Sequence, residues 1–421
     1  MKAARAIPLL LLVLAGCRTK PVAPKSLNDL ARRYVELAVE LGDHDLDSLD
    51  FYVKGNSDAA TYSSTSYATL HEEAVFVRDR VNRMSGDSDR KGFLLGQLES
   101  LILRIEQLQG KNRSFDEESR IFFGVVAPED EHAATRRVIR AKLATLLGGP
   151  ANKAAAYSKY ETQFIVPPVL VPVVMRVALD ECRAVTLTHM ALPAGEHVDV
   201  TYVSHKPWSA FSRYLGGAHS VIQVNMDYPL TVDRILNLAC HEGYPGHHVF
   251  NSIRDQELVQ TKHREEFRVQ TTFSPQSYVS EAAANYAPSL LSEQDRRHIE
   301  RDILMPLAGL KALDIEQDLE VERLVNGLHT AQPAIARDYL DGRLEFVRAT
   351  DSLEREALME HAETMLLYLN EFRTYMLAYT VGSDAVQQMV EAGTPSDTER
   401  WRRYVTLMTN PVVSLPTATQ R

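Results

Sequence analysis

The stretch CHEGYPGHHVF, residues 240–250, gathers the side chains of this chain that are best suited to metal chemistry. A helical zinc-protease motif has two histidines four residues apart, with glutamate directly after the first. Here the intervals from His241 to His247 and His248 are six and seven residues. On a continuous helix, His247 would lie about 240° around the axis from His241, and His248 would lie roughly 10 Å along it. A regular helix therefore cannot give two of these histidines a common metal ion.

Pro245 changes that geometry, because it has no N–H to donate to the carbonyl of His241 and its ring would clash with that carbonyl. Gly243 and Gly246 lower the cost of a distortion on either side. We expect the helix to break here and a short loop to return one histidine to His241. Zinc hydrolysis needs about three protein ligands, an open position and a carboxylate that takes a proton from water, and Glu242 is the candidate for this carboxylate.

The sequence HEGYPGHH resembles the signature of the bacterial family called domain of unknown function 885. That family is grouped with gluzincin-type zinc metallopeptidases such as thimet oligopeptidase, carboxypeptidase Taq and angiotensin-converting enzyme. Matching Gly246-His247 to the family's Gly-His pair implies that His241 and His247 are ligands of one Zn²⁺ ion and that Glu242 is catalytic. His248 stays open as the alternative second ligand or as an additional site residue.

Later blocks extend the resemblance. The block SYVSEAAANYA implies Glu281, 34 residues after His247, as the third zinc ligand, and Tyr286 as an additional site residue. It departs from the family's Glu-Gly-Trp-Ala-Leu-Tyr pattern, since Ala282-Ala283 replace Gly-Trp and Asn285 replaces Leu.

Two further blocks, RLVNGLH and AYTVG, resemble family blocks that follow the zinc ligands. By analogy with related peptidases they imply that His329 and Tyr379 are catalytic donors of hydrogen bonds to the oxyanion of a tetrahedral intermediate.

The elements around these residues are predicted from periodicity. Thr231 can cap a helix whose apolar stripe, Val232, Ile235, Leu236 and Ala239, leads to His241. The segments HVDVTYV (197–203) and SVIQVN (220–225) read as short strands, and the second is expected to hold an extended substrate by backbone pairing. Helical periodicity dominates elsewhere, so the fold class expected is mainly α: one large helical domain with a small β-sheet beside the motif helix. The family resemblance implies that this domain is gluzincin-like (zincin).

The N-terminus carries a targeting signal. Residues 1–17 read as a lipoprotein signal peptide whose lipobox, Leu14-Ala15-Gly16-Cys17, makes Cys17 the lipidation site; an ordinary signal peptide is the alternative. Residues 18–26 form a predicted tether, and 27–421 a single domain with an N-terminal helical part (27–160) and a metal-site part (161–421). Arg18 after the cysteine favours the outer membrane, with the protein facing the periplasm.

Composition and charge limit the classes of partner that this protein is expected to bind. A formal net charge of −10 argues against a surface for nucleic-acid phosphates. Three cysteines make no disulfide scaffold, and the sequence leaves open whether Cys182 and Cys240 pair. The histidines outside the motif that join no cluster are interpreted as ordinary surface or core residues: His197, His205, His219 and His263.

These patterns predict a zinc-dependent hydrolase of the bacterial cell envelope with one Zn²⁺ ion and a peptide or peptide-like substrate. Membrane contact is expected through the N-terminal lipid alone, and the oligomeric state is left open. The alternatives are an inactive relative that acts as a binding or assembly factor, and a metal-dependent hydrolase of a non-peptide amide or ester.

Overall fold

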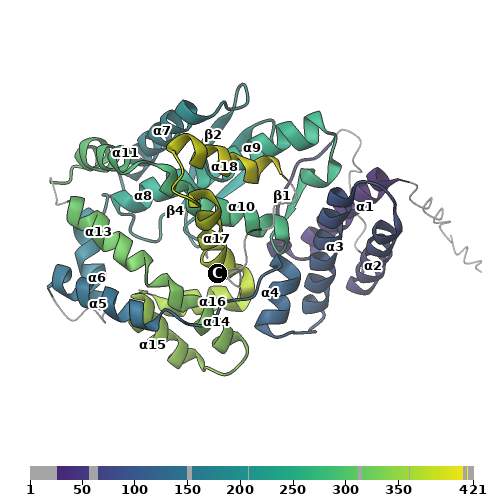
Figure 1. Ribbon diagram of the computed structural model, residues 1–421, viewed down its shortest axis with the longest axis horizontal. Coiled ribbons are helices and arrows are strands. Elements are labelled where there is room, and N and C mark those ends of the chain that lie inside the picture. The colour runs from purple at the N-terminus through teal and green to yellow at the C-terminus, as the bar shows by residue number, and fades with distance from the viewer. Residues whose placement is uncertain are drawn as a thin grey trace, which may run out of the picture.

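The computed structural model describes residues 26–55, 65–148, 154–206, 208–311, 315–359, 361–410 and 415. Cys17 and the predicted signal peptide lie outside these ranges, as does almost all of the predicted tether. Helices predominate, so the prediction of a mainly α fold is confirmed (Figure 1). The α-helices are α1 Leu27–His44, α2 Tyr67–Arg83, α3 Ser88–Leu108, α4 Phe115–Phe123, α5 Ala133–Leu147, α6 Ala154–Glu161, α7 Val171–His189, α8 Val232–Leu238, α9 His247–Arg254, α10 Pro275–Tyr286, α11 Glu293–Arg297, α12 Met305–Leu307, α13 Ile315–Asn326, α14 Gln332–Leu340, α15 Phe346–Ala357, α16 Ala362–Phe372, α17 Val381–Glu391 and α18 Asp397–Thr409.

The N-terminal helices α1, α2 and α3 lie together at one end of the molecule (Figure 1). Ser26 starts α1 with a capping box, in which its hydroxyl accepts from the Asp29 N–H and the Asp29 carboxylate accepts from the Ser26 N–H. Their apolar faces share one core, which Leu258, Phe267 and Val269 from the middle of the chain complete. The N-terminal helices are thus packed onto the segment that follows α9.

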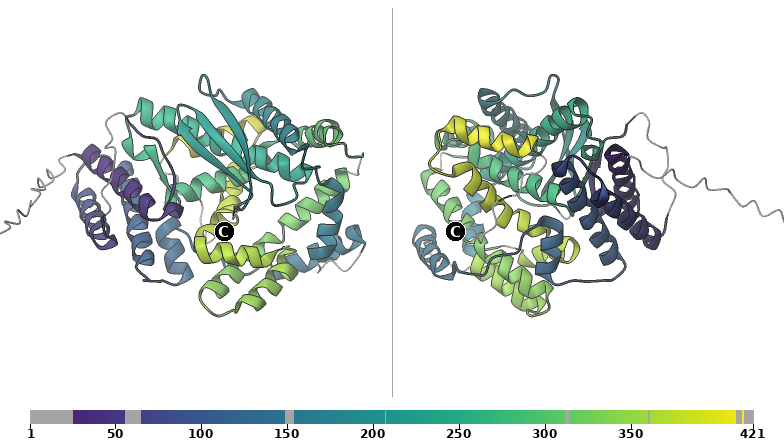
Figure 2. Two further views of the ribbon diagram at one scale, coloured as in Figure 1. Left: turned by 180° about the vertical axis from the view of Figure 1, so that it is seen from behind. Right: turned by 45° about the vertical axis from the view of Figure 1, so that its right-hand side comes forward.

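Two small sheets accompany the helices. Strand β1, Leu49–Tyr52, pairs antiparallel with β5, Val269–Thr271. The second sheet has the order β2-β4-β3, with β2 His197–Val203 parallel to β4 His219–Asn225 and β3 Ala210–Gly216 antiparallel to β4. Figure 2 shows these three strands side by side. Both predicted strands exist, whereas β1, β3 and β5 were not predicted.

The position of β4 corrects one expectation. The segment SVIQVN lies in β4, which is paired on both sides, so its backbone has no free edge for a substrate. β3 is an edge strand of this sheet, because it pairs with β4 alone. An extended ligand can therefore pair with β3 and not with β4.

A larger core joins the sheet to the remaining helices. It contains the predicted stripe of α8, together with Phe250 of α9, Met376 and Trp401 of α18. Helix α10 packs against α17 so closely that a Cβ on Gly382 would lie 2.9 Å from the Cβ of Ala282. In Figure 1, α5, α6 and α14–α16 lie in the lower part of the molecule, and the sheet lies in the upper part with α7, α9 and α11.

The apolar, proline-rich segment 164–175 enters α7, with Pro172 in the first turn of that helix. Phe164, Val166 and Val171 of this segment are buried, whereas Val169 and Val173 are exposed. Within the described ranges, none of the helices combines the length and the apolar character needed to cross a membrane.

Candidate metal centre

The motif helix breaks where Pro245 predicts. α8 ends at Leu238, a wider π-type turn covers Ala239–Gly243, and α9 begins at His247. Such turns inside helices are frequent at functional sites. The Tyr244–Pro245 peptide bond is cis.

Gly246 closes the break by direct backbone contact. Its N–H donates to the carbonyl of Cys240 at 2.9 Å, and a Cβ at this position would lie 1.8 Å from the carbonyl oxygen of His241. No L side chain fits in that space. The absence of a side chain at Gly246 therefore lets the chain fold back and start α9 beside His241.

The break brings the three predicted ligands together. His241 Nε2 lies 3.3 Å from Glu281 Oε1, and His247 Nε2 lies 3.3 Å from Glu281 Oε2. The two imidazole rings are 4.8 Å apart, nearly perpendicular, with an interplanar angle of 83°. His241 lies before the break, His247 lies after it, and Glu281 lies on α10. Ser274 caps α10 by accepting from the Ser277 N–H.

These distances suit a tetrahedral cation. With bonds of about 2.0–2.1 Å, two ligand atoms of a zinc tetrahedron lie about 3.3 Å apart. The donor set of two imidazoles and one carboxylate is that of many catalytic zinc sites, and both rings are partly open to solvent. The residues present thus fit one divalent ion with an open position.

Each oxygen of the Glu281 carboxylate also has a supporting donor. Asn285 Nδ2 lies 3.1 Å from Oε1, and the hydroxyl of Tyr375 lies 3.1 Å from Oε2. Asn285 is one of the residues that depart from the family pattern, and here it holds the predicted third ligand. Partners of this kind fix the orientation of a ligand and tune its basicity.

The electrostatics of the cluster favour ionised Glu281. Burial alone would raise the pKa of its carboxyl group, but the charges and hydrogen bonds of His247 and His241 outweigh burial and hold that pKa well below its usual range. Burial would lower the pKa of His247, but Glu281 raises it to about 9, with a smaller contribution from Glu242. Glu281 thus supplies negative charge for a cation, and a bound cation would displace the proton that this carboxylate otherwise holds on His247.

Glu242 lies at the edge of the cluster, buried, with Oε1 3.9 Å from His241 Nε2. Burial raises the pKa of its carboxyl group, while His241 and His247 oppose that effect. A backbone hydrogen bond from Ser212 of β3 also reaches this carboxylate. Because the Asn225 N–H donates to the Ser209 carbonyl, Ser212 belongs to the alternate residues whose backbone groups point away from β4. The free edge of β3 thus faces Glu242.

Tyr379 lies next to the predicted ligands. Its ring packs edge-on against Tyr375, at 5.9 Å between centroids, and its hydroxyl is 3.4 Å from that of Tyr368. Burial and the charge of Glu281 raise the Tyr379 pKa well above its usual value, although 40% of the residue is exposed. Its ring contacts Tyr375, whose hydroxyl donates to Glu281, so Tyr379 is one side chain away from the predicted third ligand.

His329 does not contact the cluster. It starts the short 3₁₀ turn before α14, is exposed, and lies near the charge of Arg234. In the part of the chain that the structure describes, it has no hydrogen bond or ion pair with His241, Glu242, His247 or Glu281. Its predicted role as a donor needs a substrate that reaches from the cluster to the Arg234 side.

His248 and Tyr286 point away from the predicted ligands. His248 is fully buried, with Nδ1 2.8 Å from the Ser220 hydroxyl and Nε2 3.0 Å from Glu196. The Tyr286 hydroxyl donates to Glu391 of α17. Between the two histidines left open by the sequence, the geometry places His247 at Glu281 and gives His248 to a separate buried network.

Cys240 also turns away from the cluster. Its sulfur lies 2.6 Å from that of Cys182 on α7, and both residues are buried free thiols in this structure. Cys240 therefore contacts α7 and contributes no ligand to the cluster.

Three supporting residues were missed by the sequence analysis. Tyr375 and Tyr379 are four residues apart, a spacing that can bring two side chains to one helical face, so Tyr375 could have been found. Ser280 Oγ lies 3.4 Å from His247 Nδ1, one residue before Glu281. The charge of Asp50 on β1 also helps to raise the pKa of His247. Asp50 lies in the N-terminal part of the chain, and no sequence signal marks it.

Comparison with known proteins adds little to what the structure shows. No family model matches this chain, and no curated protein does. A solved structure described as "the putative lipoprotein from Colwellia psychrerythraea" matches 83% of this chain and 67% of its own length, at 13% sequence identity and a TM-score of 0.44. The resemblance to the domain of unknown function 885 family and to gluzincins therefore stays a prediction.

Proposed function

We propose that this protein is a metal-dependent hydrolase, with Zn²⁺ as the expected ion, that cleaves a peptide or peptide-like amide. The convergence of His241, His247 and Glu281, at separations suited to one tetrahedral cation, carries the proposal. The location of Glu242 beside this group supports it.

His241, His247 and Glu281 would hold the cation, which would supply the positive charge that polarises water and the scissile carbonyl. Glu242 takes a proton from the attacking water and returns it to the leaving nitrogen. Tyr379 donates a hydrogen bond to the carbonyl oxygen on which negative charge develops. Asn285 and Tyr375 keep the Glu281 carboxylate in place throughout.

The free edge of β3 supports a peptide as the substrate. The outward backbone groups of Ala210 and the outward carbonyl of Ser212 can pair with an extended chain, as other proteins do when a peptide adds a strand to a sheet. Such pairing would run a peptide past Glu242, because the Ser212 N–H already reaches that carboxylate.

The proposed location is the bacterial cell envelope. It rests on the leader and on lipidation of Cys17, with the outer membrane and the periplasm as the finer expectation from Arg18.

The test is metal analysis of the purified protein together with assays on mixed peptides. We expect stoichiometric zinc in the wild type and in Glu242→Gln, and its loss from this centre in Glu281→Ala. Glu242→Gln should lower cleavage by roughly 100- to 10,000-fold, because only the proton carrier is removed. Glu293→Gln makes the same chemical change on a side chain that is 85% exposed and should leave both readouts unchanged.

A folded wild-type protein that takes up no divalent metal would refute the proposal. Metal binding without cleavage of any peptide would favour the alternative of a binding or assembly factor. Cleavage of a non-peptide amide alone would keep the chemistry and change the substrate class.

A further inference from the structure

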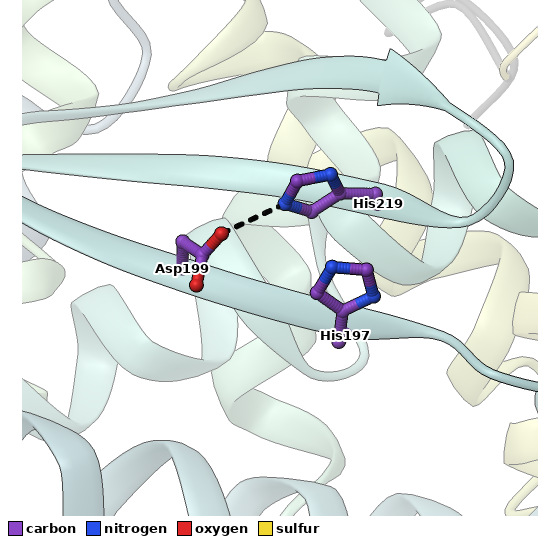
Figure 3. Close-up of side chains that lie close together, drawn as sticks. All are labelled: His197, Asp199 and His219. Atoms are coloured by element: carbon purple, nitrogen blue, oxygen red, sulfur yellow. Dashed lines mark hydrogen bonds and ion pairs between the residues drawn. The ribbon is translucent and has the colours of Figure 1, made fainter.

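A second group of metal-ligating side chains lies on the sheet. His197, Asp199 and His219 offer one ligand atom each, all within 4.8 Å of one another, and Figure 3 shows the three side chains gathered over two neighbouring strands. The sequence analysis interpreted His197 and His219 as ordinary residues, because they are far from the motif and 22 positions apart. Strand register brings them together.

The register explains the grouping. His197 of β2 pairs directly with His219 of the parallel strand β4, and Asp199 follows His197 by two residues on the same face. His197 and Asp199 are exposed and His219 is half-buried. Their neighbours Val198 and Ser220, whose side chains point to the other face, are buried. All three polar side chains therefore project from the solvent face of the sheet.

The hydrogen bonds leave ligand atoms available. His197 Nδ1 lies 3.2 Å from the carbonyl oxygen of Gly195, which can only accept. In the neutral ring the proton is therefore on Nδ1, and Nε2 keeps a free lone pair. His219 Nε2 lies 2.9 Å from Asp199 Oδ2. Histidines that bind metal ions often resemble His197 in this respect, because their second ring nitrogen donates to a backbone carbonyl.

We propose that His197, Asp199 and His219 form a second site for a divalent transition-metal ion. The ion takes the place of the proton between His219 Nε2 and Asp199, and in the neutral ring that proton moves to Nδ1, so that Nε2 offers its lone pair to the ion. The distance between His219 Nε2 and Asp199 Oδ2 needs to grow from 2.9 Å to about 3.3 Å to admit a cation with bonds of about 2.0–2.1 Å. The stacked imidazole rings, 3.9 Å between centroids, turn about their side-chain bonds so that both lone pairs reach the ion.

The donor set selects the metal. Two imidazoles and one carboxylate suit Zn²⁺, Ni²⁺ and Cu²⁺, whereas Ca²⁺ and Mg²⁺ prefer oxygen ligands alone. At a site of fixed ligands, Cu²⁺ binds more tightly than Ni²⁺ or Zn²⁺. Since three protein ligands leave positions open to solvent, water completes the coordination.

This site is independent of the proposed hydrolytic centre. The buried face of the same strands carries Ser220, which holds His248, while the cluster occupies the opposite face. Stoichiometry can therefore separate the two: two ions per wild-type chain, one in His219→Asn and one in Glu281→Ala. If the hydrolytic centre binds no metal, the wild type binds one ion, which Glu281→Ala keeps and His219→Asn loses.

The experiment is calorimetric titration of the metal-free, full-length protein with Zn²⁺, repeated with Cu²⁺ and Ca²⁺. His197→Asn and His219→Asn keep a polar side chain and remove an imidazole, and circular dichroism checks that they fold. Each should weaken zinc binding at this site by more than the roughly 10- to 100-fold that loss of a supporting partner costs. Cu²⁺ should bind more tightly than Zn²⁺, and Ca²⁺ should not compete.

The matched control is His298→Asn, which removes an imidazole that lies 3.0 Å from Asp302 and that, among the described residues, belongs to no group of metal-ligating side chains. It should bind as the wild type does. Unchanged zinc stoichiometry and affinity in both folded cluster variants would overturn the proposal. Equal losses in His298→Asn, or binding of Ca²⁺ as tight as that of Zn²⁺, would do so as well.

Discussion

The carboxylate of Glu281 has four close partners, two for each oxygen. Oε1 faces His241 and Asn285, and Oε2 faces His247 and Tyr375. The two histidines would be ligands in the proposed centre, whereas the amide and the hydroxyl position the carboxylate without contacting a cation. Tyr375 and Tyr379 therefore have separable tasks, although their rings touch.

Replacing each tyrosine by phenylalanine separates these tasks. Tyr375→Phe removes the donor to Glu281 and should weaken zinc binding by roughly 10- to 100-fold, because the ligand loses its support. Tyr379→Phe should leave zinc binding unchanged and raise the barrier to hydrolysis by about 2.7 to 4 kcal/mol, the usual effect of losing one oxyanion donor. The measurements are zinc affinity and kcat with a cleaved peptide.

Tyr286→Phe is the control for both variants, since that hydroxyl donates to Glu391 away from the cluster. Equal zinc affinity in Tyr375→Phe and wild type would show that the contact with Glu281 does not position a ligand.

At the scale of elements, the break between α8 and α9 decides whether the motif can bind a cation. Gly246 sits against the carbonyl groups of Cys240 and His241, so the two helices approach at a point where no side chain fits. The proximity of His241 and His247 depends on this contact, because a straight helix would turn them apart.

Gly246→Ala should therefore lose zinc binding and destabilise the fold by at least the roughly 1–3 kcal/mol typical of overpacking. The measurements are the free energy of unfolding in urea and the zinc content. Gly92→Ala in α3 is the control, since a Cβ there meets no atom within 4 Å. It should stabilise the helix by up to about 1 kcal/mol. A Gly246→Ala protein with wild-type zinc content would contradict the proposed role of the turn.

At the scale of the whole molecule, a group of carboxyl groups lies where α13 meets α8 and the π-type turn His298–Leu304. Asp318 of α13 is 6% exposed, and burial raises its pKa to about 8 with help from the charges of Asp233 on α8 and Glu300. Burial also raises the pKa of Glu300 to about 7, against the effect of Arg296. Folding thus holds protons on these groups that the unfolded chain would release.

This arrangement sets the sign of a pH dependence. Below about pH 4 Asp318 is protonated in both states, and between about pH 4 and 8 the unfolded chain alone loses the proton, so stability falls as pH rises. Asp318→Asn is neutral throughout. Between about pH 4 and 8 this variant should lose less stability than the wild type. At pH 8 it should be more stable than the wild type by up to about 3 kcal/mol. Urea unfolding at pH 5 and pH 8 measures the effect.

Asp302→Asn is the matched control, because that carboxylate is paired at the surface with Arg301 and His298 and has a lowered pKa. It should not change the slope between pH 5 and pH 8. A wild-type protein equally stable at both pH values, with Asp318→Asn equal to it, would contradict the prediction.

The sequence by itself determined the helical class, the strands β2 and β4, the apolar stripe of α8 and the break at Pro245, because each follows from local periodicity or from a backbone property of one residue. The motif also indicated His241, Glu242 and His247, and the resemblance added Glu281. Only the tertiary structure decided that His247 and not His248 faces Glu281, that Tyr375 and Asn285 support this carboxylate, and that β3 is the edge strand beside Glu242. It alone brought His197 and His219 together, since strand register and helix packing join residues whose separation along the chain carries no local signal.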